Sequence, residues 1–597
     1  MILQALCDYY ERKSDLPRLG FETKAIPFVI EINAAGQLVQ IEDTRTIEGK
    51  KKIAHNFLVP QGEKKTSGVA TNLLWDNAEY VLRACGTDKL AEMSMEKRMK
   101  YRLRLREMHS AFIEQIRALP ESVYEDTGLT AVLNFLVSDF KHMKANRKRL
   151  KADPFWPEIL ETNPVLTFRL NGDLELVCQR SAVRAVLEKV ETDTEEITCS
   201  VSGEIDVFER LHTSIKGVWG AQSSGANIVS FNKAAFNSFG KEQGANAPVG
   251  KHAVFAYTTA LNWLLRKEST QRIQVGDAST VFWSEKHTDL ENTFADLFDE
   301  PPKDDPAKQT RAIEALFKAP QTGALSDEGG KTRFYVLGLA PNAARISVRF
   351  WQVSTVAEMS ARIRWHFEDL EIDHASYEKP YLSLFRLLVA TATQGKSENI
   401  PPNLAGEFMR AILAGLPYPQ TLLQAAVRRI RAEQSKKDER TGKPVPNVSY
   451  PRAALIKACL NRQARYSPSH EKEITVSLDD SNTNPGYRIG RLFAALEKIQ
   501  EESSPSLNAT IRDRFYGAAS STPVTVFANL MKLKNHHLAK LEEGRKRYFE
   551  KLIGQIMSDI NDFPAHLSLA DQGRFAIGFY HQRQAFFTKS ESTTKGE

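Results

Sequence analysis

The sequence predicts an α+β protein, with a mixed N-terminal region of β-hairpins and helices and an all-α C-terminal region that ends in a helical bundle. Paired apolar segments separated by short turns, which are typical of hairpins, occur before residue 355. After that point, apolar residues recur at helical spacing. We therefore expect an α+β domain over 1–355, a helical connecting region over 356–465 and a helical bundle over 466–597.

The first expected elements are a helix over 2–12 and a hairpin whose strands cover 26–32 and 37–41. A lysine-rich loop follows, and helical spacing of apolar residues predicts a helix that begins near Thr71. The segment 92–118 is expected to be a long helix rich in arginine and lysine.

Two further hairpins are expected. The strands 165–170 and 173–177 flank an Asn-Gly dipeptide, which is the strongest short signal for a hairpin turn. The strands 334–339 and 345–351 are joined by a short turn that contains proline. The segment 299–306, rich in proline and charge, is expected to be a surface loop or hinge.

The remainder of the chain is expected to be helical. Polar, turn-rich linkers are expected over 434–449 and 466–485. The expected helices cover 355–369, 379–393, 404–415, 419–434, 451–464, 487–501, 507–516, 523–542, 545–561 and 568–587.

The composition is that of an ordinary globular protein. The chain has 597 residues, of which 42% are hydrophobic and 26% charged, which excludes wholesale disorder and a disulfide-rich scaffold. No run of eighteen apolar residues occurs, and the first residues lack the pattern of an export signal. We expect a cytoplasmic protein with no membrane partner, whose five separated cysteines are reduced.

The net charge of +6 is unevenly distributed. It is +4 over residues 1–150, −7 over 151–400 and +9 over 401–597. Basic ends around an acidic middle would suit a protein that holds a polyanion at two places, although solvated surfaces vary as much.

No catalytic motif is present. The segment 220–225 has the glycine spacing of a phosphate-binding loop, but Ala226 and Asn227 stand where lysine and a hydroxyl residue are needed. The segment 330–332 has the other half of that motif, but Leu325 replaces its first glycine. No nucleophile signature is found. We expect a protein that is not an enzyme and that binds no cofactor.

Metal ligands are not expected either. The cluster Glu285–Asp289 has no spacing that a common metal site requires, so a solvated loop explains it better. His536 and His537 are adjacent in an expected helix and so point about 100° apart. We expect one of the two histidines to be packed and the other exposed.

Two glycine-containing segments are candidate nucleic-acid contacts. The segment 62–72 combines lysine and hydroxyl groups before the expected helix, although a solvated loop before a capped helix is an equally good interpretation. The segment 217–232 is rich in small and amide residues, which suits minor-groove reading, although a tight turn also explains its glycines. The candidate residues, expected to meet on one surface, are Lys64, Lys65, Thr66, Ser67, Gly68, Asn72, Gln222, Ser223, Ser224, Gly225 and Asn227.

Basic clusters are secondary candidates. They lie at 97–106 and 141–151, with weaker examples at 428–431 and 545–547. Each cluster suits either phosphate contacts or a solvated surface.

Several segments resemble the large subunit of the type I-C CRISPR Cascade surveillance complex. They follow one another in the same order from the first residue to about residue 545. The segments are Met1–Leu6, Phe57–Gln61, Thr66–Gly68, Leu74–Leu82, Gln222–Asn232, Tyr335–Arg345 and Leu507–Arg514.

This resemblance implies a non-catalytic subunit that recognises the protospacer-adjacent motif (PAM) on double-stranded DNA. The subunit would aid duplex opening, stabilise the R-loop and its displaced strand, and dock a helicase-nuclease, while guide pairing selects the sequence. The implied partners also include crRNA and the backbone, handle-binding and small subunits of Cascade. The small subunit is implied to resemble the C-terminal helical part of the large subunit and to be made by translation that starts inside the same gene. The C-terminal 130 residues contain only Met531 and Met557 as ordinary starts, and either would truncate the bundle, so we expect a non-methionine start within 466–485.

Two other functions remain open on the sequence alone. One is a stand-alone metal-dependent DNA-processing enzyme, whose carboxylates would converge from distant positions. The other is a scaffold that binds crRNA or acidic partner subunits without touching DNA.

Overall fold

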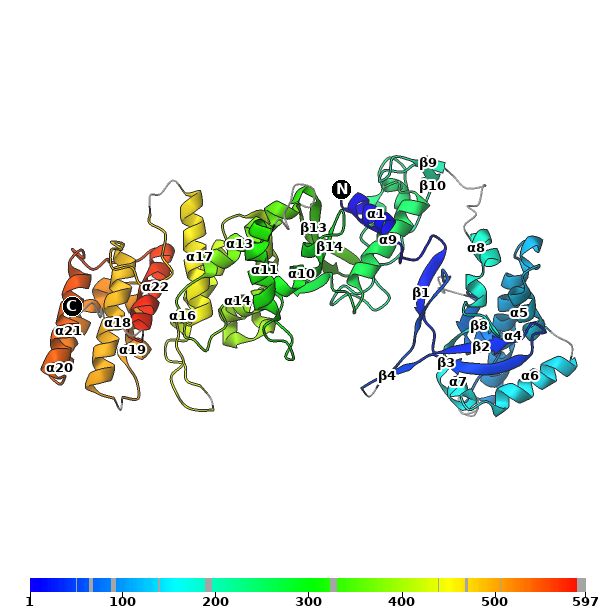
Figure 1. The fold of residues 1–597 in the computed structure, drawn as a ribbon, viewed down its shortest axis with the longest axis horizontal. Coiled ribbons are helices and arrows are strands. Elements are labelled where there is room, and N and C mark those ends of the chain that lie inside the picture. The colour runs from blue at the N-terminus through cyan, green and yellow to red at the C-terminus, as the bar shows by residue number, and fades with distance from the viewer. Residues whose placement is uncertain are drawn as a thin grey trace. The chain divides into compact units, whose positions relative to one another are not determined.

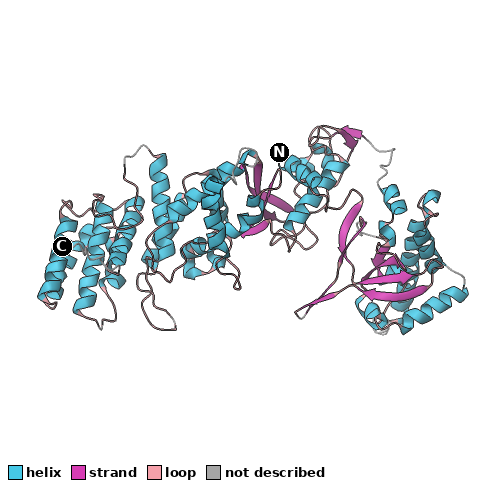
Figure 2. Cartoon of the chain, viewed as in Figure 1, coloured by secondary structure: helices cyan, strands magenta, loops and turns pink. Residues whose placement is uncertain are grey.

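The structure is a computed structural model (Figure 1 and Figure 2). It describes residues 1–587 apart from 50, 64–67, 87–92, 138–139, 188–195, 323–329, 439, 468–470 and 506. The chain forms two compact units. The large unit comprises Met1–Arg12, Leu211–Asn246 and Ala260–Glu597, and the small unit comprises Lys13–Arg210 and Ala247–Thr259. The predicted α+β class is confirmed.

The small unit is built on a four-stranded sheet with strand order β3-β2-β8-β7. Strand β2 is almost wholly buried, because it lies inside the sheet and helix α5 packs against it. The sheet strands are β2 (Phe28–Ile32), β3 (Leu38–Asp43), β7 (Trp75–Asn77) and β8 (Val165–Leu170). Three two-stranded pairs are β1 (Phe21–Ala25) with β6 (Asn56–Pro60), β4 (Thr46–Glu48) with β5 (Lys51–Ile53), and β9 (Glu196–Thr198) with β10 (Ile205–Val207).

Helices cover this sheet and extend from it. They are α2 (Ala78–Val81), α4 (Met95–Arg117), α5 (Thr127–Val137), α6 (Phe140–Ala152), α7 (Trp156–Thr162) and α8 (Ser181–Leu187). Helix α9 (Lys251–Leu265) contains the boundary between the two units. The predicted first hairpin is confirmed as β2 and β3, and the predicted long basic helix is confirmed as α4.

Three predictions for the small unit are wrong. The lysine-rich segment after the first hairpin is not a single loop, because it contains strands β4, β5 and β6. No helix begins near Thr71, because residues 75–77 pair with β8 as strand β7 and the helix is only the short α2. The Asn-Gly turn does form, but the segment 173–177 is not a strand. Strand β8 is already paired with β2 on one side and β7 on the other, so the returning segment makes only an isolated bridge between Leu176 and Arg169.

The large unit contains an antiparallel sheet of order β11-β12-β13-β14. Its strands are β11 (Arg272–Val275), β12 (Ala278–Ser284), β13 (Arg333–Asn342) and β14 (Arg345–Thr355). The hairpin predicted over 334–351 is confirmed as β13 and β14. Helix α1 (Ile2–Arg12) packs beside β12, where the Trp283 Nε1–H group donates to the Ala5 carbonyl (3.2 Å).

The change from strand to helix at residue 355 has a local cause. Thr355 Oγ1 accepts from the Glu358 N–H group (3.2 Å), and the Glu358 carboxylate accepts from the Thr355 N–H group (3.3 Å). This capping box begins helix α13 (Val356–Leu370) directly after β14.

Each helix expected after residue 355 is present, some of them shorter than expected. After α13 they are α14 (Leu384–Thr391), α15 (Pro402–Ala414), α16 (Gln420–Ala432), α17 (Tyr450–Tyr466), α18 (Pro485–Ser503), α19 (Ile511–Ala519), α20 (Phe527–Leu538), α21 (Glu543–Met557) and α22 (Leu569–Ala585). Helices α10 (Asp289–Phe298) and α11 (Lys308–Thr322), which precede the hairpin of β13 and β14, were not expected, and neither were α5, α6, α7, α8 and α9. Among the described residues, no helix combines the length and apolar character needed to cross a bilayer.

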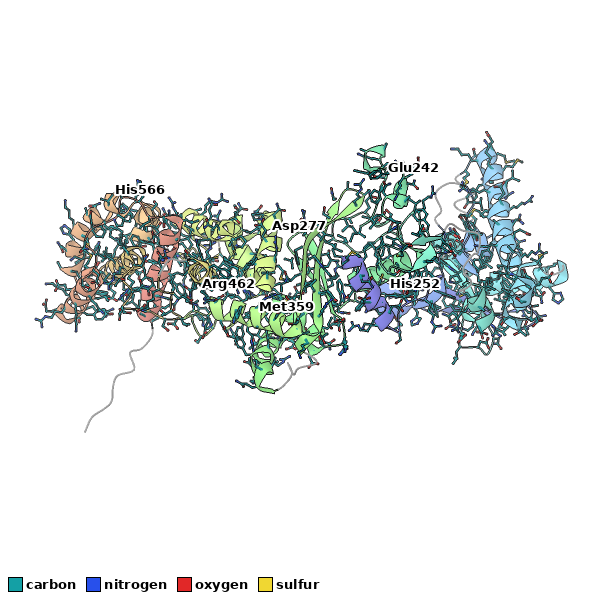
Figure 3. The ribbon with its side chains drawn as sticks, turned by 90° about the horizontal axis from the view of Figure 1, so that it is seen from above. Glu242, His252, Asp277, Met359, Arg462 and His566 are labelled. Carbon is teal, nitrogen blue, oxygen red and sulfur yellow. The ribbon has the colours of Figure 1, made fainter. Side chains whose placement is uncertain are left out.

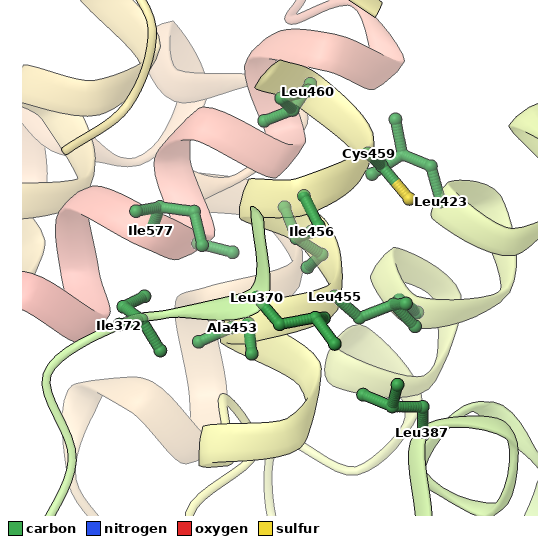
Figure 4. Packing of buried hydrophobic residues seen from close by; sticks show 14 of the residues in the cluster. Leu370, Ile372, Leu387, Leu423, Ala453, Leu455, Ile456, Cys459, Leu460 and Ile577 are labelled. Atoms are coloured by element: carbon green, nitrogen blue, oxygen red, sulfur yellow. The ribbon is translucent and has the colours of Figure 1, made fainter. Parts of the chain in front are cut away.

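One hydrophobic core runs through the helical part of the large unit (Figure 4). Helix α17 packs against both α16 and α22, and its Ile456 and Leu460 side chains approach within 3.1–3.2 Å of the Cβ position at Gly573 of α22. Residues on both sides of position 465 therefore share a core. The predicted division of the chain at 355 and 465 stays a prediction.

Candidate nucleic-acid interface

The first candidate loop, residues 62–72, belongs to the small unit, and its Lys64–Ser67 portion lies outside the described residues. Its two ends are tied together by Asn72, whose Oδ1 atom accepts from the Glu63 N–H group (2.9 Å). The Asn72 N–H group in turn donates to Asp76 Oδ2 (3.0 Å). Asn72 is only 6% exposed, so its side-chain oxygen holds the base of the loop rather than facing solvent.

Two further features shape this loop. The Trp75 indole donates to the Pro60 carbonyl (2.8 Å) and so fixes the strand that leads into the loop. Gly68 is exposed and has a φ of +85°, and no atom of the described residues lies within 4 Å of its Cβ position. The geometry is that of a loop with a rigid base.

The second candidate loop, residues 211–232, belongs to the large unit. Ile215 and Ala226 pair as an antiparallel bridge, with N–H···O distances of 2.8 and 2.9 Å. Gly225 adopts a φ of +94°, and a Cβ atom there would lie 2.9 Å from both the Ile215 oxygen and the Ser214 Cβ. Glycine is therefore required at position 225 to close the loop on itself.

The loop is joined to the tip of the hairpin formed by β13 and β14. The Ile346 N–H group donates to the Asn227 carbonyl (3.0 Å). The Asn227 Nδ2 group donates to the His212 carbonyl (2.8 Å), so this side chain stabilises the loop internally. On the other side of the loop, the Trp219 N–H group donates to Ser279 Oγ of β12 (2.9 Å).

The tip of the second loop is exposed. Gln222, Ser223 and Ser224 all lie in an exposed turn, which is closed by the Gly225 N–H group donating to the Gln222 carbonyl (2.9 Å). Hydroxyl and amide groups are thus presented to solvent on a braced turn. The segments 222–232 and 335–345, both part of the Cascade resemblance, meet at this tip.

The surrounding stretch has an unusual charge. Residues 211–241 contain no aspartate or glutamate, although they lie within a part of the chain whose net charge is −7. The same stretch holds three lysines and four aromatic residues. A surface that lacks carboxylates and carries lysine, amide and aromatic side chains is electrostatically suited to a nucleic acid.

The small unit carries a separate cationic cluster. The pKa of Arg83 is lowered by partial burial and by the positive charges of Arg106 on α4 and Arg147 on α6. Helix α4 is held near this point because the His109 Nδ1 atom bonds to the Tyr80 carbonyl (2.8 Å). Sequence reasoning missed Arg83, because it lies alone between α2 and α4 and joins the cluster only in the fold.

Some side chains of the other basic clusters bond to carboxylates or to a backbone carbonyl. Lys100 on α4 pairs with Glu96 (2.8 Å), although both side chains are more than three-quarters exposed. Arg149 on α6 donates to the Leu38 carbonyl (2.8 Å), and Arg545 pairs with Glu502 (2.6 Å). These interactions favour a structural role for Arg149 and Arg545.

The two candidate loops belong to different compact units. The expectation that both contribute to one surface therefore stays a prediction, as do the roles of the individual residues.

Metal ligation was not expected, and within the part of the chain that the structure describes no group of three histidine, cysteine or carboxylate side chains is placed to hold a metal ion. His536 is exposed, whereas His537 is half-buried and its Nδ1 atom shares a hydrogen bond with Ser503 Oγ (3.0 Å). The expectation of one packed and one exposed histidine is met.

A family model described as CRISPR-associated protein (Cas_Csd1) matches residues 6–587. The chain belongs to the Cas_Csd1 family. No curated protein matches it. The Cas_Csd1 match spans both units and both candidate loops, and it agrees with the resemblance to a Cascade subunit at the level of a Cascade-type CRISPR-associated protein. Such a protein acts in a complex with other CRISPR-associated proteins and a crRNA.

Proposed function

We propose that this Cas_Csd1 chain is the non-catalytic large subunit of a type I-C Cascade. In this role it recognises the PAM on double-stranded DNA, aids opening of the duplex, stabilises the R-loop and docks the helicase-nuclease. The observation that carries the proposal is the exposed turn Gln222–Ser224, which is braced on the tip of the hairpin of β13 and β14 within a stretch that lacks carboxylates.

A braced turn of this kind suits duplex recognition. Base edges in the minor groove present mainly acceptors, so amide and hydroxyl donors match them, and a small side chain such as serine allows close approach. Rigidity matters because a turn that is already ordered loses little conformational entropy on binding. The bridge between Ile215 and Ala226 and the contact between Asn227 and Ile346 supply that rigidity.

The small unit supplies charge in this proposal. In the sequence, Lys64 and Lys65 lie between Glu63 and Asn72, which are hydrogen-bonded to each other, and Arg83, Arg106 and Arg147 form a cationic cluster. Phosphate contacts from such groups position the duplex without reading its sequence. Lys64→Ala is therefore expected to weaken binding to all duplexes alike and to reduce its salt dependence.

The test uses the assembled complex and two duplexes that differ only in the PAM. Ser223→Ala combined with Ser224→Ala is expected to reduce the preference for the PAM duplex at least about 30-fold, since each lost base contact costs about 1–3 kcal/mol and the two together cost at least about 2 kcal/mol. Ser397→Ala, at another exposed serine of the large unit, is the matched control and is expected to bind as the wild type does. An unchanged PAM preference in the double variant would contradict the role of the turn.

Two assays separate the alternatives. If the purified chain cleaves labelled duplex with Mg²⁺ or Mn²⁺, it is a DNA-processing enzyme and not the subunit proposed. If the complex shifts PAM-containing duplex equally well with and without this chain, the chain is a scaffold that does not touch DNA.

A further inference from the structure

The turn Ser238–Lys241 presents an aromatic side chain directly to solvent. Phe239 is 97% exposed, and its backbone has a φ of +52°. A bulky residue in this left-handed region is a genuine outlier, and such strain persists only where the surrounding structure enforces it. The backbone conformation destabilises the free protein, and the exposed ring contributes no burial energy to offset this cost.

Asn246 enforces this conformation. Its Oδ1 atom accepts from the Ser238 N–H group (2.9 Å), and its Nδ2 group donates to the carbonyls of Lys241 (3.1 Å) and Gln243 (3.0 Å). The turn itself is closed by the Lys241 N–H group donating to the Ser238 carbonyl (3.0 Å). The ring of Phe239 is therefore carried on a braced turn and not on a loose loop.

The segment before this turn is linked to the hairpin of β13 and β14. The Arg345 guanidinium lies 4.2 Å above the ring centroid of Phe236, and it also donates to Asn232. Two exposed lysines, Lys233 and Lys241, flank the turn. The nearest carboxylate in sequence is Glu242, which follows the turn and is labelled in Figure 3.

This combination points to an unpaired nucleobase. Aromatic rings stack on any base because every base has a π-face, and neighbouring lysines neutralise the phosphates on either side. A folded protein partner would be expected to cover an apolar patch. Phe239 is the one aromatic ring of the polar turn Ser238–Lys241, and the partly exposed ring of Phe236 before it lies under the Arg345 guanidinium.

We propose that Phe239 stacks on an unpaired base of the displaced DNA strand. The proposal rests on the proposed function, because in an R-loop the guide pairs with the target strand and leaves the bases of the displaced strand unpaired. The lysines beside the turn bind the phosphates of the strand, and the ring stacks on one base and so prevents that base from pairing again with the target strand.

The experiment measures binding of the full-length chain to a labelled single-stranded oligonucleotide, and it follows 2-aminopurine fluorescence in the displaced strand of the assembled complex. Phe239→Ala and Phe239→Leu are expected to weaken binding about 5- to 150-fold, because stacking is worth about 1–3 kcal/mol per base. Phe239→Trp is expected to retain binding. In the complex, 2-aminopurine near the PAM should be quenched with Phe or Trp and bright with Ala or Leu.

Tyr377→Ala is the matched control, since Tyr377 is an 87% exposed aromatic of the same unit outside the stretch 211–241. It is expected to leave both measurements unchanged. Thermal unfolding of each variant verifies that it is folded. Because Phe239 is exposed, its replacement should not disturb the fold.

The outcomes distinguish the inference from the function on which it rests. If Phe239→Ala binds and quenches as the wild type does while the complex still prefers PAM duplex, the stacking role is wrong and the proposed function stands. If Phe239→Leu behaves as the wild type does, the contact is apolar and not stacking, which also overturns the inference. If the wild-type complex shows no preference for PAM duplex, the proposed function itself fails.

Discussion

Gly225→Ala tests the claim that closure of the second loop orients its exposed turn. Alanine must adopt a φ of +94° at this position, which costs about 1–2 kcal/mol. Its Cβ atom must also be relieved from 2.9 Å contacts with the Ile215 oxygen and the Ser214 Cβ, and crowding of this kind adds about 1–3 kcal/mol. The bridge between Ile215 and Ala226 should therefore be weakened by about 2–5 kcal/mol in total.

Hydrogen exchange measures this loss directly, because the Ala226 N–H group donates to the Ile215 carbonyl. A change of about 2 kcal/mol in the free energy of local opening accelerates exchange about 30-fold. We expect at least that acceleration in the peptide that spans 214–227, together with reduced retention of PAM duplex by the complex.

Gly240→Ala is the matched control for Gly225→Ala. Gly240 also has a positive φ (+70°), but no atom lies within 4 Å of its Cβ position. Only the backbone term of about 1–2 kcal/mol should remain, confined to its own turn. Equal exchange of the 214–227 peptide in the two variants would refute the argument that close approach at Gly225 holds the loop.

Three further predictions concern stability and binding. Asp369→Ala leaves the buried Arg462 without its carboxylate and should lower the free energy of unfolding in denaturant by about 3–5 kcal/mol, whereas Glu543→Ala at an exposed pair should change it by less than about 0.5 kcal/mol. Burial, and secondarily the charge of Lys457, lowers the pKa of His581 to about 4 from an ordinary value of 6.5. Because the native state resists protonation, the contribution of neutral His581 to the free energy of unfolding is complete above pH 6.5. The free energy of unfolding should therefore fall by about 2 kcal/mol between pH 7 and pH 5. Denaturant titrations of His581→Gln should not show this fall. Arg147→Ala should reduce the slope of log binding constant against log salt concentration by about one if its guanidinium contacts a phosphate, and an unchanged slope would exclude that contact.

The helical half of the chain was predictable because its signals are local. Two local signals mark the start of α13: the capping box of Thr355 and Glu358, and the helical spacing of apolar residues after it. Both act within a few residues, so they can be recognised in the sequence without knowledge of the fold. The Asn-Gly turn after β8 was equally local, and it formed. Its expected strand did not, because the pairing of β8 with β2 and β7 is a property of the sheet.

Strands β11 and β12 were missed for a related reason. Strand β12 is buried along its whole length, so it lacks the alternation of apolar and polar residues that identifies a half-exposed strand. Its burial is a property of the fold: the Phe282 ring packs on Phe294 of α10, and the Trp283 indole donates to the Ala5 carbonyl of α1, which comes from the start of the chain.

The candidate loops show how far composition leads towards a site. The lack of carboxylates over 211–241 is visible in the sequence, and it marks the stretch that contains the exposed turn. The structural role of each residue within this stretch could not be predicted from the sequence. The side-chain amide of Asn227 donates to the His212 carbonyl, and Gly225 allows the close approach that forms the bridge between Ile215 and Ala226. Nothing in the sequence indicated that Phe239 is exposed.

Helix α17 covers the face of α22 that carries Gly573 and Ile577 (Figure 4). A polypeptide that started within 466–485 would contain α22 but not α17, and this face would be bare. Binding to an apolar surface that replaces α17 would stabilise such a fragment. It should therefore self-associate when alone and stay soluble once assembled. In a cell that makes both forms, the uncovered face of α22 would favour binding of the shorter form to a larger complex.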